Sequence, residues 1–180
     1  MRIVFIGSVF FSKLMLEQLI RLNSNIVGVC TKKKSKFNAD FFDLSKVSLK
    51  YKIPTVYSSD VNSDLTYRWI KKRKPDIIFC LGWSSLIGER LLKVSSKGVI
   101  GFHPTELPAN RGRHPIIWTL ALGLKRTAST FFFMKRKADA GDIISQRKIS
   151  VRQNDNARSL YKKIIITASK QIMQIVRELK

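Results

Sequence analysis

Short apolar runs alternate with amphipathic stretches along this chain, and their order predicts an α/β protein. Mostly apolar runs with the length of buried strands occupy residues 2–6, 26–30, 76–81 and 98–102, two of which begin with a charged residue. After the first run, Leu16, Leu19 and Ile20 recur at the spacing of a helix that buries one face. Strands that alternate with such helices predict one Rossmann-like domain over residues 1–180, an open and mostly parallel sheet with helices on both faces.

The remaining segments complete this prediction. Further strands are expected at residues 129–134 and 142–150, with a short edge strand at 53–57, where a proline is tolerated. Helices are expected from a cap at Ser12 to about Leu22, over 65–74 and over 115–122. The clearest helical periodicity lies at the C-terminal end, after a cap at Asp155 or Asn156.

Charge is the unusual part of the composition. Thirty-four Lys and Arg residues stand against twelve Asp and Glu residues, for a net charge of +22. With 44% hydrophobic residues the chain is an ordinary globular protein, so disordered and collagenous classes are excluded. Such a charge attracts phosphate-bearing ligands or nucleic acid. The alternative is that lysine and arginine merely cover the surface of a compositionally biased protein.

Other composition signals narrow the class further. Cys30 and Cys80 lie within apolar runs and are expected to be buried thiols, not a disulfide. No apolar run approaches the roughly 18 residues needed to span a bilayer. The apolar N-terminal start is interrupted by Lys13 and Glu17 without a cleavage site, so a cytoplasmic protein is expected. No Cys or His spacing indicates a metal site.

Both histidines fall in one stretch, residues 101–115, which also holds three of the five prolines. It follows a predicted strand and precedes a predicted helix. Open α/β sheets bind ligands at the carboxyl ends of their strands. His103 there is suited to proton transfer near neutral pH.

Three further loops are candidates for binding. A basic segment that begins at residues 32–36 is either a solvated loop or a phosphate-gripping one. Trp83, just beyond a strand, is either core or a platform for a planar ligand. Asp139 and Asp142 lie in a glycine-bearing loop and either make a turn or act chemically. A single glycine, Gly7, follows the first strand, where a dinucleotide fingerprint needs three, so NAD binding is not expected.

The segment 103–115, taken together with Asp139-Ala140-Gly141-Asp142-Ile143, resembles the formyltransferase family that uses formyl-tetrahydrofolate. Its members include glycinamide ribonucleotide, methionyl-tRNA and sugar N-formyltransferases. The resemblance extends over nearly the whole chain. It implies the formyltransferase fold and 10-formyltetrahydrofolate as the formyl donor.

The resemblance also implies catalytic residues. The family uses an Asn, a His two residues later and an Asp from a downstream loop, and His103 and Asp139 match the last two. Gly101 stands where the family has the Asn, a donor to the oxyanion. Losing such a donor typically costs about a hundredfold to a thousandfold in rate. Asn110, in the same loop, is the candidate replacement.

Ligand-binding residues follow from the same resemblance. It implies a folate site formed by Trp83, Ser84, Leu86, Ile87, Asp139 and Asp142. It implies that the amine substrate, expected to carry phosphate, faces Lys33, Lys34, Arg111, Arg113 and His114.

The class of the acceptor is inferred by elimination among the members of this family. Methionyl-tRNA enzymes carry an additional C-terminal domain, whereas this chain ends after one helix. A nucleotide-linked amino sugar of surface polysaccharide synthesis is therefore the expected acceptor. The alternatives are a methionyl-tRNA acceptor and a catalytically silent homologue that binds nucleic acid or another polyanion. A homodimer is left open.

Overall fold

The computed structural model describes residues 1–35 and 38–179. Its strands are β1 (Arg2–Ile6), β2 (Asn25–Thr31), β3 (Thr55–Tyr57), β4 (Ile77–Cys80), β5 (Val99–His103), β6 (Arg126–Phe133) and β7 (Ile143–Ser150). Its helices are α1 (Phe10–Arg21), α2 (Ser45–Lys50), α3 (Asp64–Lys72), α4 (Glu89–Leu92), α5 (Pro115–Ala121) and α6 (Ala157–Leu179).

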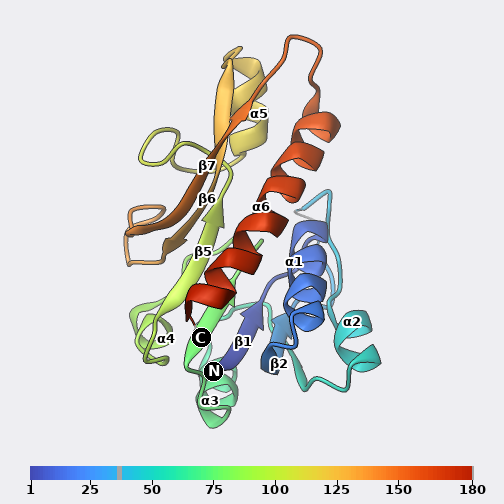
Figure 1. Cartoon of the computed structure of the whole chain (residues 1–180). Coiled ribbons are helices and arrows are strands. Elements are labelled where there is room, and N and C mark those ends of the chain that lie inside the picture. Colours follow the sequence, from blue (N-terminus) through green and yellow to red (C-terminus); the bar gives the residue numbers. More distant parts are fainter. Residues whose placement is uncertain (36–37, 180) are drawn as a thin grey trace.

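All the named strands form one open sheet in the order β3-β2-β1-β4-β5-β6-β7 (Figure 1). Strands β3, β2, β1, β4 and β5 pair in parallel, whereas β6 and β7 add to β5 antiparallel. The mostly parallel α/β prediction is therefore confirmed, and β3 is the edge strand that the sequence predicted. The strand order reverses direction between β1 and β4, the kind of place where such sheets bind ligands.

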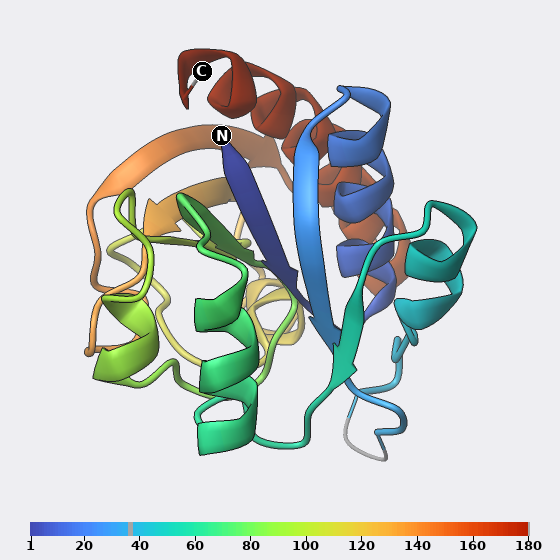
Figure 2. The same cartoon turned by 90° about the horizontal axis from the view of Figure 1, so that it is seen from below.

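Helices cover both faces of the sheet, and β1 shows why. Ile3 and Phe5 point into a core built with α1 and α6, whereas Val4 and Ile6 point into a core built with α3 and α4. Because side chains alternate along a strand, an apolar run buries both faces. Figure 2 shows α1 and α6 on one side of the sheet and α3 and α4 on the other.

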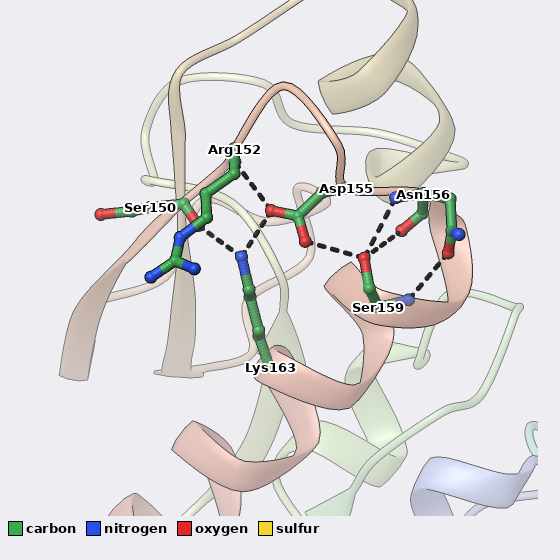
Figure 3. A network of polar contacts seen from close by, with 6 residues as sticks. All are labelled: Ser150, Arg152, Asp155, Asn156, Ser159 and Lys163. Atoms are coloured by element: carbon green, nitrogen blue, oxygen red, sulfur yellow. Dashed lines mark hydrogen bonds and ion pairs between the residues drawn. The ribbon is translucent and has the colours of Figure 1, made fainter.

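A polar network fixes the start of α6 (Figure 3). The Asn156 side chain caps the helix, its Oδ1 accepting a hydrogen bond from the Ser159 amide at 3.0 Å. Asp155 Oδ1 accepts from Ser159 Oγ at 2.7 Å, and its other oxygen pairs with the Lys163 ammonium. Lys163 also donates to the carbonyl of Ser150, the last residue of β7, at 3.2 Å. The network thus joins the end of the sheet to the C-terminal helix.

Some local expectations were wrong. Helix α1 begins at Phe10 with Val9 as its cap, so Ser12 lies inside the first turn. The Ser12 hydroxyl accepts from the Val9 amide and donates to the Leu81 carbonyl at 2.6 Å, which ties α1 to the end of β4. Helices α2 and α4 were not expected, because six and four residues are too short to display a helical period.

Both cysteines are free and buried, as predicted. They lie opposite Ile6 on its two neighbouring strands, so two strand spacings, roughly 9 to 10 Å, separate their backbones and preclude a disulfide. Over the described part of the chain, no helix is both long and apolar enough to cross a membrane.

Candidate active site

A pocket of about 390 Å³ opens at the carboxyl ends of β4 and β5. The loop after β4 contributes Trp83 to its lining, and the end of β5 contributes His103. Asp139, from the loop between β6 and β7, lines the same pocket. Three segments far apart in sequence therefore converge where parallel sheets place their ligands.

The orientation of His103 is fixed by a main-chain contact. Its Nε2 lies 3.0 Å from the carbonyl oxygen of Asn110. Because a carbonyl only accepts, Nε2 carries the hydrogen in this contact. The other ring nitrogen, Nδ1, lies 3.9 Å from Asp139 Oδ2. The imidazole is buried, and both His103 and Asp139 line the pocket, with Nδ1 on the side of the carboxylate.

Residues of the loop that follows His103 hold Asp139 in place. Its Oδ2 accepts a hydrogen bond from the Gly112 amide at 3.0 Å, and its carbonyl accepts from Arg111 Nε at 2.9 Å. Asp139, Asn110 and His114 all have positive φ, between 50° and 57°. Such backbone conformations in non-glycine residues concentrate at functional sites.

The antiparallel strands hold the loop that follows His103. Thr127 of β6 donates its hydroxyl to the Pro104 carbonyl at 2.8 Å, and Thr130 donates to the Thr105 carbonyl at 2.7 Å. These side chains are buried, where a hydrogen bond to an otherwise unpaired carbonyl matters most. Strand β6 therefore helps to position the loop that carries the pocket residues.

Gly101 leaves room that a neighbour fills. A Cβ at this position would lie 2.8 Å from Met134 Cγ and 3.0 Å from Phe132 Cζ. Met134, Phe132 and Gly101 all line the pocket. Where the family resemblance implies an amide side chain, this chain therefore has an apolar floor.

The residues expected to bind folate mostly gather in the pocket. Trp83, Ser84, Leu86 and Ile87 line it, and Leu86 is 60% exposed, so its side chain is accessible to a ligand. Asp142 does not line it; its carboxylate pairs with Lys135 at 3.0 Å on the surface.

The residues expected to bind the acceptor divide in two. Arg113 and His114 line the pocket, whereas Lys33 and Lys34 are exposed outside its lining. Lys36 of the same basic segment lies outside the described residues. Arg111 also lies outside the lining and holds Asp139.

Asn110 contributes to the site through its main chain. Its carbonyl orients His103, while the residue lines a neighbouring depression and not this pocket. A catalytic role for its side chain stays a prediction.

Several pocket residues were not expected from the sequence. They are Asn38, Cys80, Phe132, Met134 and Lys135. The nearest signal was the basic segment just before Asn38. No cluster of three or more His, Cys, Asp or Glu side chains that could hold a metal ion occurs in residues 1–35 and 38–179.

Comparison with known proteins places the chain in a family. The formyl transferase family model matches residues 1–176. The bifunctional polymyxin resistance protein ArnA of Wigglesworthia glossinidia brevipalpis is 35% identical over 83% of this chain and 23% of its own length. Methionyl-tRNA formyltransferase of Thermotoga sp. (strain RQ2) is 30% identical over the whole chain and 59% of its own length. The chain thus spans less than two thirds of the length of these relatives.

Solved structures share the fold. Phosphoribosylglycinamide formyltransferase from Bacillus halodurans superposes with a TM-score of 0.83 at 18% identity, covering 100% of this chain and 97% of that one. WlaRD, a sugar 3N-formyl transferase with dTDP and 5-N-formyl-THF, superposes with a TM-score of 0.77 at 20% identity, covering 98% and 62%. With the family model matching almost its entire length, this chain belongs to the formyl transferase family.

Proposed function

We propose that this chain transfers a formyl group from 10-formyltetrahydrofolate to the primary amine of a nucleotide-linked amino sugar. The observation that carries the proposal is the pairing of His103 with Asp139 across a pocket at the sheet edge. Family membership supports the reaction type, and the charge of the pocket supports a phosphate-bearing acceptor.

The pocket fits the formyl donor. Its volume is within the range of small-molecule sites, and the side chains of Trp83, Ile87, Phe132 and Met134 give it apolar walls. Ser84 and the backbone of the loop after β4 offer polar contacts beside those walls. These walls suit a flat heterocycle, and the donor bound there supplies an activated formyl group.

Formyl transfer forms a bond between the amine nitrogen and the formyl carbon and breaks the bond from that carbon to the donor nitrogen. The amine loses a proton and the donor nitrogen gains one. His103, with Nε2–H held by the Asn110 carbonyl, exchanges protons at Nδ1. When both ring nitrogens are protonated, Nδ1–H stabilises negative charge on the formyl oxygen, and the Asp139 carboxylate stabilises the cation.

Basic side chains at the pocket support an anionic acceptor. Arg113 and Lys135 line it, Asp139 is the single carboxylate among its described lining residues, and Lys135 also pairs with Asp142 outside the lining. Arg suits bidentate contacts to phosphate. WlaRD, described with dTDP and a formyl folate, supports a nucleotide-linked sugar. A methionyl-tRNA acceptor is the second candidate, because the charge of +22 suits nucleic acid.

The test is mass spectrometry of the chain incubated with 10-formyltetrahydrofolate and a panel of amino sugar nucleotides. We expect one acceptor to gain the mass of a formyl group, and His103→Ala and Asp139→Asn to abolish the gain. Methionyl-tRNA is included in the panel, and product on it alone would select the second candidate.

A catalytically silent binding protein is the third candidate, favoured by the apolar floor beside Gly101. It predicts that no acceptor is modified and that folate does not bind. The His103 and Asp139 pair argues against it, since a protein that only binds polyanions has no use for that geometry.

A further inference from the structure

One buried hydroxyl closes the loop that follows His103. Thr105 is 1% exposed, and its Oγ1 donates a hydrogen bond to the Ala109 carbonyl at 3.1 Å. This carbonyl belongs to the peptide that joins Ala109 to Asn110. The next carbonyl, that of Asn110 itself, accepts from His103 Nε2 at 3.0 Å. Asn110 therefore lies between two hydrogen-bonded carbonyls, and the Thr105 hydroxyl holds the first of them.

The backbone conformation of Asn110 depends on these two contacts. Its φ of 55° lies in the left-handed region, which costs energy in any residue other than glycine and persists only where surrounding contacts hold it. Without the Thr105 hydroxyl, the Ala109–Asn110 peptide is able to rotate and Asn110 to return to a negative φ. The Asn110 carbonyl then turns away from the His103 ring.

The base of this loop is fixed by the two antiparallel strands. The Thr105 carbonyl accepts from the Thr130 hydroxyl at 2.7 Å. Gln146 Nε2 donates to that hydroxyl oxygen at 3.1 Å and to the Leu107 carbonyl at 3.0 Å. Both hydrogens of the Gln146 amide and the one hydrogen of the Thr130 hydroxyl are thus used on this loop. Thr105 therefore presents its own hydroxyl from a fixed position.

The direction of the Asn110 carbonyl decides which nitrogen of His103 carries the hydrogen. A neutral imidazole has one N–H, and the partners of the two nitrogens select its place. The Asn110 carbonyl selects Nε2 and leaves a lone pair on Nδ1, on the side of Asp139. If that carbonyl turns away, the Asp139 carboxylate, 3.9 Å from Nδ1, favours hydrogen on Nδ1 instead. An Nδ1 that already carries hydrogen cannot take the proton of the amine.

We propose that Thr105 is a positioning residue for His103, whose hydroxyl fixes the Ala109–Asn110 peptide and, through the Asn110 carbonyl, keeps the imidazole hydrogen on Nε2. This deepens the proposed function and rests on it for the part that His103 plays in formyl transfer. Thr105 is not among the residues that line the pocket, so it acts on the reaction through His103 and not through a ligand.

Two substitutions separate the hydroxyl of Thr105 from its shape. Thr105→Val removes the hydroxyl and keeps the branched side chain, whereas Thr105→Ser keeps the hydroxyl and removes the methyl group. Ala109 is exposed, so its carbonyl can accept from water in the valine variant, and the protein should still fold. Thr167→Val is the matched control, because the Thr167 hydroxyl donates to the Lys163 carbonyl at 2.9 Å within α6, away from the pocket.

The first measurement is the imidazole ¹⁵N chemical shifts of untagged, labelled protein without substrate. It is made at about pH 8.5, two units above the ordinary pKa of a histidine. A nitrogen that carries hydrogen and one that does not have well-separated shifts. The chain has two histidines, so His114 is a reference in the same spectrum. The second measurement is kcat and KM for formyl transfer.

We expect His103 of the parent, of Thr105→Ser and of Thr167→Val to carry hydrogen on Nε2. In Thr105→Val the two shifts of His103 should move toward each other, as for mixed tautomers, while those of His114 stay in place. The same variant should lose about tenfold to a hundredfold in kcat, with KM for the formyl donor within about twofold of the parent. Thr105→Ser should keep kcat within about threefold.

Three results would overturn this role of Thr105. An unchanged His103 tautomer in Thr105→Val would show that the hydroxyl does not control the ring. Equal effects of Thr105→Ser and Thr105→Val would assign the change to packing of the methyl group. An equal fall in kcat in Thr167→Val would assign it to general destabilisation. The tautomer is read without substrate, so it decides the positioning of His103 even where the parent modifies no acceptor and the proposed reaction fails.

Discussion

Replacing Gly101 with asparagine tests how this chain differs from its family. A Cβ there would lie 2.8 Å from Met134 Cγ and 3.2 Å from Met134 Sδ, closer than side chains pack without rearrangement. Overpacking of this kind typically costs about 1 to 3 kcal/mol. Gly101→Asn alone should therefore lower the free energy of unfolding by that amount.

Shortening the neighbour should relieve the clash. In Gly101→Asn/Met134→Ala the Met134 contacts disappear, and only the approach to Phe132 Cζ at 3.0 Å remains. The double variant should be more stable than the sum of the single changes predicts, by at least about 0.5 kcal/mol, as for residues in contact. The double variant places an amide donor beside His103. Its kcat should therefore exceed the kcat of the single variant Met134→Ala by up to about a hundredfold.

Urea unfolding of the four proteins in this cycle gives the coupling energy, and formyl transfer to the identified acceptor gives kcat. Additive stability changes would refute the contact between positions 101 and 134. Coupled stability with an unchanged kcat would refute the idea that a donor is lacking there, and would indicate that another group already serves the formyl oxygen.

Three further outcomes are expected. Hydrogen bonds from Lys163 and its neighbours lower the pKa of Asp155 to about 2, whereas an unfolded aspartate titrates near 4. Asp155→Asn should therefore melt below the parent at pH 7, the difference shrinking as the pH falls from about 4 to 2; a constant difference would contradict this. Gly141→Ala should lower kcat at least about tenfold, because a Cβ would overlap the Phe133 carbonyl and displace the pocket carboxylate; an unchanged rate would mean that the loop adapts. Burial raises the pKa of the Cys30 thiol to about 12, so native protein should resist a thiol reagent at pH 8 and react once unfolded.

The sequence predicted what depends on local pattern. Mostly apolar runs such as residues 76–81 identified the central strands, and the helical period identified α6, because burial leaves a regular pattern in the sequence. The antiparallel addition of β6 and β7 leaves no such trace, since strand direction depends on pairing between distant segments. The cytoplasmic location and a homodimer stay predictions.

The site residues also separate into those that local sequence predicted and those that depend on distant contacts. Trp83 and His103 were found because Trp83 lies just beyond the end of β4 and His103 lies at the end of β5, where ligands bind. Asn38 was not found from the sequence. Its loop is held by a hydrogen bond from Tyr161 to Asp40, which lies 121 positions away along the chain. The main-chain role of Asn110 also escaped sequence reading, which weighs side chains alone.

The contact from the Asn110 carbonyl to His103 has a consequence for how this protein tolerates change. What the imidazole needs at position 110 is a backbone with φ near 55°, a conformation open to Gly, Asn and Asp and unfavourable for Val or Ile. A glycine there should keep the enzyme working, while a valine should tilt the ring. An alanine scan would underrate the position, because the oxygen that matters is present in all twenty residues and only its direction is encoded.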